Sequence, residues 1–174
     1  MDKPKFLYHA SPNSNIETLE PRADSLPDDW KNGDAVFATT SPEYASFFIV
    51  STKDVWANMG NISGVFYFVC ADKERFLKED VGGTVYKLPS ETFNYYKGFE
   101  WYSREPVKPV GKTHIKSGLD FMIKSGVQVY FIDERTFKKI KTSKDKGAEI
   151  MNRTQSENEK RGLKVRKLDI QKKR

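Results

Sequence analysis

The residues able to carry out acid–base, nucleophilic or metal chemistry are few in this chain. Its 174 residues include two histidines, His9 and His114, and one cysteine, Cys70. Cys70 lies within the apolar run 65–71, where a thiol packs as a small hydrophobic group and has no partner for a disulfide within the chain. Two histidines and one cysteine cannot assemble a Cys/His zinc site, and no spacing of carboxylates predicts another metal site. We therefore expect no metal.

His9 is expected at the end of a strand. Residues 6–10 form an aromatic and aliphatic run, and residues 11–15 contain the Ser, Pro and Asn typical of a turn. Residues 21–33 hold two prolines and several charges without periodicity, which indicates a surface loop. The sequence therefore places His9 where a strand meets a turn.

A second strand and a helix are expected next. Residues 35–40 are typical of a buried strand, and Ser41 follows them as a helix N-cap. Pro42 at the first helical position and Glu43 in the first turn strengthen this start signal. We expect the helix to continue to about Ser51.

The remaining pattern indicates a mixed α and β chain with many strands and few helices. A short helix is predicted over residues 119–123, ending near Gly126. Further strands are predicted by apolar or β-branched runs at 64–71, 84–88, 99–103 and 127–132. Prolines confine residues 106–109 to an edge or an irregular path.

Three of these segments together resemble the ADP-ribosyltransferase superfamily, of the poly(ADP-ribose) polymerase and diphtheria-toxin type, whose His-Tyr-Glu signature is spread over three strands. Its first element is similar to Tyr8-His9-Ala10-Ser11. The resemblance implies that the His9 imidazole hydrogen-bonds the adenosine ribose of NAD. It also implies that the backbone at Ala10 pairs with the nicotinamide carboxamide.

The second element resembles residues 36–38, Val-Phe-Ala, followed at the family spacing by Ala45-Ser46-Phe47. Two family tyrosines that stack on nicotinamide correspond to Val36 and Phe47. Phe47 offers a ring for stacking, whereas Val36 does not. Phe37 and Tyr44 are therefore the alternatives for the ring that is missing at Val36. The resemblance also implies that Ala38 contacts NAD.

The third element resembles the segment Phe99-Glu100-Trp101-Tyr102-Ser103, in which a glutamate begins a strand. The resemblance implies that Glu100 is the catalytic carboxylate, with Glu105 as the alternative in a shifted register. Cleavage of the bond between nicotinamide and ribose passes through an oxocarbenium-like state, and a fixed anion stabilises the developing positive charge.

The resemblance covers residues 6–132 and implies a split antiparallel β-sheet in an α+β catalytic domain, residues 1–141. It implies an NAD-dependent ADP-ribosyltransferase that uses NAD as a substrate, with a protein or nucleic acid as acceptor, or with water in NAD hydrolysis. One alternative is the related RNA 2′-phosphotransferase. That reaction needs several arginines for the substrate phosphate, and this sequence is poor in them, with only Arg22, Arg75 and Arg104 near the motifs.

The charge distribution suggests a different kind of function. Residues 135–174 contain 15 basic and 5 acidic residues, net +10, whereas residues 1–134 contain 15 basic and 19 acidic, net −4. We expect residues 142–174 to be a basic, helical and largely solvated extension. A non-catalytic module could bind nucleic acid or an acidic protein through Lys138, Lys139, Lys141, Lys164, Arg166 and Lys167. A toxin or effector is a third alternative.

Size and hydropathy limit these choices. Hydrophobic residues make up 37% of the chain, enough for one sizeable core and incompatible with complete disorder. No apolar stretch approaches the roughly 18 residues of a membrane-spanning helix, and no apolar segment follows the N-terminus as in a signal peptide. We expect a soluble, cytoplasmic protein.

Overall fold

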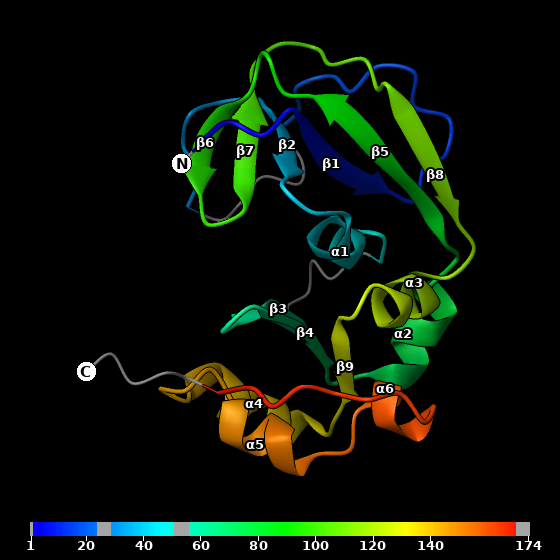
Figure 1. The fold of residues 1–174 in the computed structure, drawn as a ribbon, viewed down its shortest axis with the longest axis vertical. Helices are drawn as coiled ribbons and strands as arrows, with labels where there is room; N and C mark the ends of the chain where they lie inside the picture. Colours follow the sequence, from blue (N-terminus) through cyan, green and yellow to red (C-terminus); the bar gives the residue numbers. More distant parts are fainter. Residues whose placement is uncertain (1, 24–28, 51–55, 170–174) are drawn as a thin grey trace. The chain divides into compact units, whose positions relative to one another are not determined.

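The computed structural model describes residues 2–23, 29–50 and 56–169 (Figure 1). The chain is an α+β protein with mostly antiparallel sheets and short helices, as the sequence predicts. It divides into two compact units. Unit 1 comprises Met1–Ile49 and Gly82–Lys116, and unit 2 comprises Val50–Val81 and Ser117–Arg174. This division differs from the boundary that we expected after residue 141, because each unit is built from two separate stretches of the chain.

Unit 1 contains a six-stranded antiparallel sheet with the order β6-β7-β2-β1-β5-β8 (Figure 1). The strands are β1 (Phe6–Ser11), β2 (Val36–Thr39), β5 (Gly83–Pro89), β6 (Asn94–Lys97), β7 (Glu100–Ser103) and β8 (Gly111–Ile115). Strands β1, β2, β5 and β7 confirm the sequence predictions. The sequence analysis missed β6 and β8, which are the edge strands. They are mostly polar and exposed, so they lack an apolar pattern.

The core of unit 1 forms from alternate residues of these strands. Leu7, Val36, Ala38, Tyr86, Leu88 and Trp101 are at most 5% exposed and pack with Leu19, Phe93 and Val107. Because side chains alternate along a strand, the intervening residues of β1, β2 and β7 leave the sheet on the other face. The candidate site residues must therefore be assigned to a face one by one.

The helix after β2 begins as predicted but ends earlier. α1 spans Pro42–Ala45, and its N-cap Ser41 accepts a hydrogen bond from the Tyr44 N–H at 3.1 Å. A 3₁₀ turn, η1 (Ser46–Phe48), then replaces the α-helix. The aromatic and β-branched residues that follow have low helix propensity, which favours this early end. The predicted end at Ser51 lies outside the described residues.

Unit 2 contains a three-stranded sheet with the order β3-β4-β9, in which β3 and β4 are antiparallel and β4 and β9 are parallel. Its strands are β3 (Ala57–Ile62), β4 (Val65–Cys70) and β9 (Gln128–Phe131). Its helices are α2 (Lys73–Glu79), α3 (Gly118–Lys124), α4 (Glu134–Thr142), α5 (Ala148–Arg153) and α6 (Glu157–Lys160). The predicted strands at 64–71 and 127–132 and the predicted helix at 119–123 are confirmed.

Most described residues of the C-terminal segment of unit 2 are exposed, but a few buried residues anchor the segment to the core. Met151 of α5 and Leu168 are each 1% exposed and belong to one core with Phe137 and Ile140 of α4. The Asn152 side chain holds the backbone of Leu168, accepting from its N–H at 2.9 Å and donating to its carbonyl at 2.7 Å. Pairing of this kind between a side chain and backbone leaves no periodic signal in the sequence.

Within the described part of the chain, no helix is long and apolar enough to cross a membrane.

Candidate active site

The three segments that resemble the signature lie on adjacent strands of unit 1. His9 is in β1, residues 36–38 are in β2, and Glu100 is the first residue of β7. In the sheet, β1 pairs with β2, and β2 pairs with β7. Residues far apart in the sequence thus become neighbours across three strands.

The strand register defines a row of side chains that includes Glu100. Tyr8 pairs with Thr39, Thr39 pairs with Glu100, and Glu100 pairs with Lys97 of β6. Directly paired residues place their side chains on the same face of a sheet. Tyr8, Thr39, Glu100 and Lys97 therefore share one face. His9 follows Tyr8 in β1, so its Cβ leaves the strand on the opposite face.

Strands β1 and β2 separate at His9. Among the described residues, their ladder contains the single pair Tyr8 and Thr39. The Thr40 N–H donates to the Phe99 carbonyl at 3.1 Å, so the backbone N–H and C=O of Thr40 face β7. These groups alternate in direction along a strand, so those of Phe37 and Thr39 face β1. Continued pairing would join the Phe37 carbonyl to Ala10.

The His9 imidazole occupies this opening. Its Nδ1 lies 2.8 Å from the Phe37 carbonyl oxygen and takes the place of a backbone donor. The backbone N–H and C=O of Ala10 also face β2, because these groups alternate in direction along β1. Among the described residues, they have no ladder partner on β2. The structure thus places a histidine beside backbone groups of Ala10 that β2 does not pair, at a residue that is 5% exposed.

The environment of His9 also determines its protonation. Burial lowers the pKa of His9 from its ordinary value of 6.5, and the bond to the Phe37 carbonyl opposes this effect. The imidazole is therefore neutral at pH 7. Because a carbonyl only accepts hydrogen bonds, the proton is on Nδ1, and Nε2 remains as an acceptor. A hydroxyl group of a ligand is the kind of donor that Nε2 can bind.

We predict the Nδ1–H tautomer of His9 at pH 7, which imidazole ¹⁵N chemical shifts can identify. Since the folded pKa lies below the unfolded one, the unfolded chain binds the proton first as pH falls. The unfolding free energy should therefore decrease as pH falls below about 6.5. The variant His9→Gln should weaken this dependence, and His114→Gln, at an exposed position, should retain it. A cationic His9 at pH 7 would contradict the prediction.

Glu100 is a half-buried carboxyl group at the start of β7. Burial raises the pKa of Glu100 above its ordinary value of 4.5, the Lys97 charge lowers it, and the Asp29 charge raises it. The Lys97 ammonium is bound by both carboxylate oxygens of Asp29, at 2.7 and 2.6 Å. Glu100 is therefore a carboxyl group beside a cation that is already paired.

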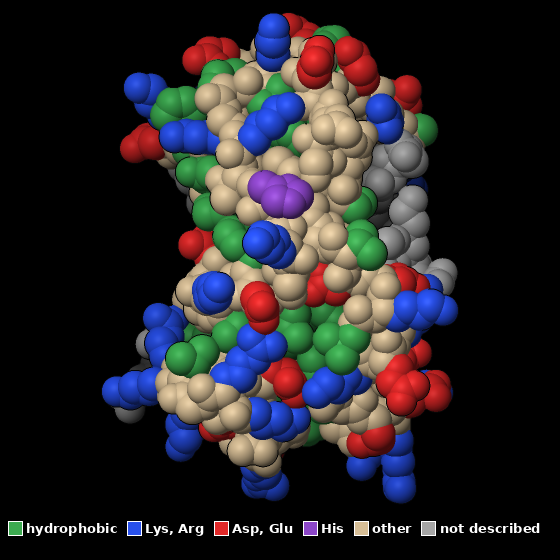
Figure 2. Space-filling model, turned by 90° about the vertical axis from the view of Figure 1, so that its right-hand side faces the viewer, with side chains coloured by type: hydrophobic (Ala, Val, Ile, Leu, Met, Phe, Trp, Pro, Cys, Tyr) green, Lys and Arg blue, Asp and Glu red, His purple; other side chains and the backbone are tan. Residues whose placement is uncertain are grey.

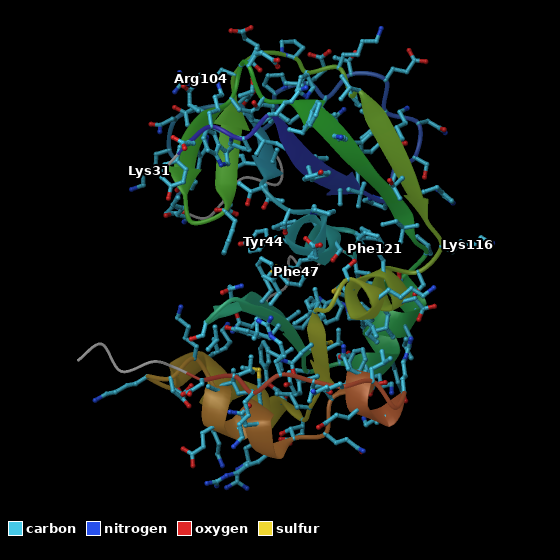
Figure 3. The ribbon with its side chains drawn as sticks, viewed as in Figure 1. Lys31, Tyr44, Phe47, Arg104, Lys116 and Phe121 are labelled. Carbon is cyan, nitrogen blue, oxygen red and sulfur yellow. The ribbon has the colours of Figure 1, made fainter. Side chains whose placement is uncertain are left out.

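Aromatic rings surround the end of this row. Tyr44 of α1 is half-buried, and its ring centroid lies 5.6 Å from that of Phe99, the residue before Glu100. Tyr44 also contacts Phe47 at 5.4 Å; both are labelled in Figure 3. Phe47 is 1% exposed, whereas Phe99 is 36% exposed. Phe99 is thus the more exposed ring of this group, and the buried Phe47 packs against Tyr44.

Two other expected contacts are more enclosed. The Phe37 ring packs against Trp30 at 5.1 Å and Tyr96 at 5.6 Å in an aromatic cluster. Ala38 is 5% exposed and belongs to the core of unit 1. Of these two residues, Phe37 participates in the site through its carbonyl, which holds His9.

Ser11 and Glu105 lie away from the Glu100 row. The Ser11 hydroxyl accepts a hydrogen bond from the Asn13 N–H at 3.1 Å, at the end of β1. Glu105 is exposed and follows the opposite end of β7 from Glu100. Five residues of extended chain correspond to about 16 Å. The structure therefore groups Glu100, not Glu105, with Tyr8 and Thr39.

Sequence reasoning missed Thr39, Tyr8 and Phe99 as site residues. Phe99 was detectable, because it adjoins Glu100 in the third motif. Tyr8 was noted as a neighbour of His9 in the first motif. Thr39 has no signal of its own in the sequence, since its place beside Glu100 depends on the pairing of β2 with β7.

The six basic residues proposed as partner contacts all lie in unit 2 and are exposed. Lys138 pairs with Glu134 at 2.7 Å, and Arg166 donates to the Gly64 carbonyl at 2.6 Å. Unit 2 contains 20 basic and 13 acidic residues, net +7, against 10 and 11 in unit 1, net −1. On the face drawn in Figure 2, Lys and Arg side chains are frequent over the lower part, which is unit 2.

Cys70 lies in unit 2 and is fully buried. Burial raises the pKa of its thiol to about 12, so it is not a nucleophile. The described residues contain no group of three or more His, Cys, Asp or Glu side chains that could hold a metal ion.

Comparisons with known proteins found no match to any family model, curated protein or solved structure.

Proposed function

We propose that the chain is an NAD-dependent ADP-ribosyltransferase whose site is in unit 1 and whose fold is a split β-sheet of the ADP-ribosyltransferase type. The reaction cleaves the bond between nicotinamide and ribose in NAD and transfers ADP-ribose to an acceptor or to water. Glu100 stabilises the positive charge that develops on the ribose. His9 binds a ribose hydroxyl through Nε2, and Ala10 pairs with the carboxamide through its backbone.

One observation carries the proposal: the β1–β2 ladder opens at His9, in the same sheet as Glu100. Because the His9 Cβ leaves β1 on the face opposite to Glu100, the proposal requires NAD to reach the His9 imidazole through this opening. The opening leaves backbone donor and acceptor groups at Ala10, which suit the carboxamide of nicotinamide. Phe99 precedes Glu100 in the chain, and its ring lies 5.6 Å from that of Tyr44; aromatic rings of this kind suit stacking on a flat heterocycle. A carboxylate, an imidazole acceptor and a stacking surface together match the chemical groups of NAD.

The direct test is nicotinamide release from NAD by the purified full-length chain, measured by chromatography with and without protein and nucleic-acid acceptors. We expect release above the non-enzymatic rate in at least one condition. Isothermal calorimetry with NAD provides an independent measurement of binding. Absence of both binding and release would reject the proposal.

A second candidate function is polyanion binding by unit 2, because the positive charge is concentrated there. The segment that contains Lys164, Arg166 and Lys167 is held against unit 2, since Gln128 donates to the Arg166 carbonyl at 2.7 Å and Leu168 is buried. Exposed cations on an anchored segment lose less conformational entropy on binding than cations on a free tail. In this case unit 2 is a nucleic-acid-binding module.

This candidate predicts steep salt dependence of binding to a double-stranded oligonucleotide. The slope of log K against log salt should be about −0.9 for each phosphate neutralised. Changing Lys139, Lys164 and Lys167 together to Gln should weaken binding and make the slope less steep. The matched control, Lys108→Gln with Lys112→Gln and Lys116→Gln in unit 1, should leave both unchanged. Fluorescence anisotropy at several salt concentrations distinguishes the two sets, and equal effects would count against unit 2 as the binding module.

A further inference from the structure

The Thr39 side chain contains a buried hydroxyl group without a partner. Thr39 is 3% exposed, and its Oγ1 has no hydrogen-bond partner in the structure. Burying an unpaired polar group destabilises a fold, and such groups are rare in native proteins. Valine has the same shape and would fill this position without that penalty. The hydroxyl therefore calls for an explanation outside the packing of the sheet.

Thr39 lies directly beside Glu100. The two residues are paired across β2 and β7, and the bond from the Thr40 N–H to the Phe99 carbonyl makes them a non-hydrogen-bonded pair. Side chains approach most closely in such pairs, with Cβ atoms about 4.5–5.5 Å apart. A change of rotamer is enough to bring a carboxylate oxygen of Glu100 to the Thr39 hydroxyl.

The other groups that face Glu100 are already engaged or more distant. Lys97 faces it from β6, but its ammonium is bound to Asp29. Tyr8 faces the row from β1, on the far side of Thr39. Among the described residues that share the face of Glu100, the Thr39 hydroxyl is thus the neighbouring donor without a hydrogen-bond partner.

We propose that Thr39 is a positioning residue for Glu100: its hydroxyl donates a hydrogen bond to the ionised carboxylate and fixes its orientation. This inference rests on the proposed function, in which Glu100 must be both ionised and correctly placed beside the ribose. The bond forms when the carboxylate carries its charge. It stabilises the ionised form in the half-buried environment, where burial alone disfavours it.

The first test is a titration of the Glu100 side-chain carboxyl by ¹³C NMR in the free protein, which needs no activity. In Thr39→Val the titration midpoint of Glu100 should be at least about half a pH unit higher than in the wild type, because the ionised form loses its donor. Thr39→Ser retains a hydroxyl and should restore the wild-type midpoint. An unchanged midpoint in Thr39→Val overturns the inference.

The second test is the effect on nicotinamide release. Thr39→Val should lower kcat by roughly ten- to a hundredfold with little change in KM for NAD, and Thr39→Ser should remain within about threefold of the wild type. A wild-type kcat in Thr39→Val overturns the inference and leaves the proposed function intact. If the wild type releases no nicotinamide, the proposed function fails, and the NMR titration still decides whether Thr39 positions Glu100.

Thermal unfolding separates positioning from a structural role. Tm is measured below pH 4.5, where Glu100 is protonated and the Thr39 hydroxyl has no carboxylate partner to lose. Under that condition the Tm of Thr39→Val should equal or exceed that of the wild type. The contrasting control is Ser103→Ala in β7, whose buried hydroxyl contacts Thr92 Oγ1 and the Glu105 carbonyl, both at 3.0 Å. Ser103→Ala should lower Tm and leave the Glu100 midpoint unchanged. A lowered Tm in Thr39→Val would assign Thr39 to the fold and overturn the inference.

Discussion

The variant Glu100→Gln is expected to lower nicotinamide release from NAD by about 10²–10³-fold, or about 2.7–4 kcal/mol of transition-state stabilisation. Gln keeps the shape of the side chain and removes the negative charge that the oxocarbenium-like state requires. KM for NAD should change much less than kcat, because the lost interaction develops as positive charge appears on the ribose.

The stability of Glu100→Gln should not fall with its activity. Burial raises the pKa of Glu100, so ionisation at neutral pH is less favourable in the folded protein than in the unfolded chain. This destabilisation is present above the folded pKa and disappears as pH falls below 4.5. At pH 7, Glu100→Gln should therefore unfold at the wild-type temperature or above it, as measured by circular dichroism.

Two comparisons make the assignment specific. The rate of the wild type should rise with pH as Glu100 ionises, with a midpoint above 4.5, and this rise should be absent in Glu100→Gln. Glu105→Gln, at the exposed opposite end of β7, should retain the wild-type rate. Equal rates in the wild type, Glu100→Gln and Glu105→Gln would refute the role of Glu100.

The variant Leu168→Ala is expected to destabilise unit 2 by about 2–5 kcal/mol, the usual range for truncating a fully buried leucine. Leu168 is 1% exposed, contacts the core that α4 and α5 form on the sheet, and has its backbone held by Asn152. Loss of its side chain leaves a cavity and removes the main apolar anchor of the C-terminal segment. Urea unfolding followed by Trp56, in unit 2, measures this effect.

The matched control is Leu163→Ala, five residues earlier in the same segment. Leu163 is 47% exposed, so its truncation should change stability by no more than about 0.5 kcal/mol. Hydrogen exchange adds spatial resolution, because Leu168→Ala should accelerate exchange in β9 and α5. If Leu168→Ala and Leu163→Ala are equally stable, the segment is not packed as the structure shows.

The local elements of this protein are largely encoded in short stretches of sequence. Apolar and β-branched runs identified β1, β2, β4, β5, β7 and β9, because each contributes alternate or continuous side chains to a core. The Ser41-Pro42 pair located the start of α1, since capping and a fixed proline φ act within one turn. The edge strands β6 and β8 escaped detection because exposed edges impose no apolar pattern.

The candidate site was predictable only in part. The motifs in the sequence made His9 and Glu100 candidates by resemblance, and left Glu105 open as an alternative. Placing Glu100 beside Thr39 requires the register of β2 against β7, and the opening at His9 requires the register of β1 against β2. Register depends on the packing of whole faces, and a shift of one residue would move every side chain to the other face.

The basic C-terminal segment illustrates the same division. Its charge, its position after residue 134 and its scarcity of apolar residues can be counted from the amino acids. The burial of Leu168, and the bonds by which Asn152 and Gln128 hold the backbone of the segment, become visible in the folded chain. These bonds join residues distant in sequence, and a backbone group can form them whatever side chain its residue carries. Composition could therefore predict the charge of this surface but not the packing that anchors it.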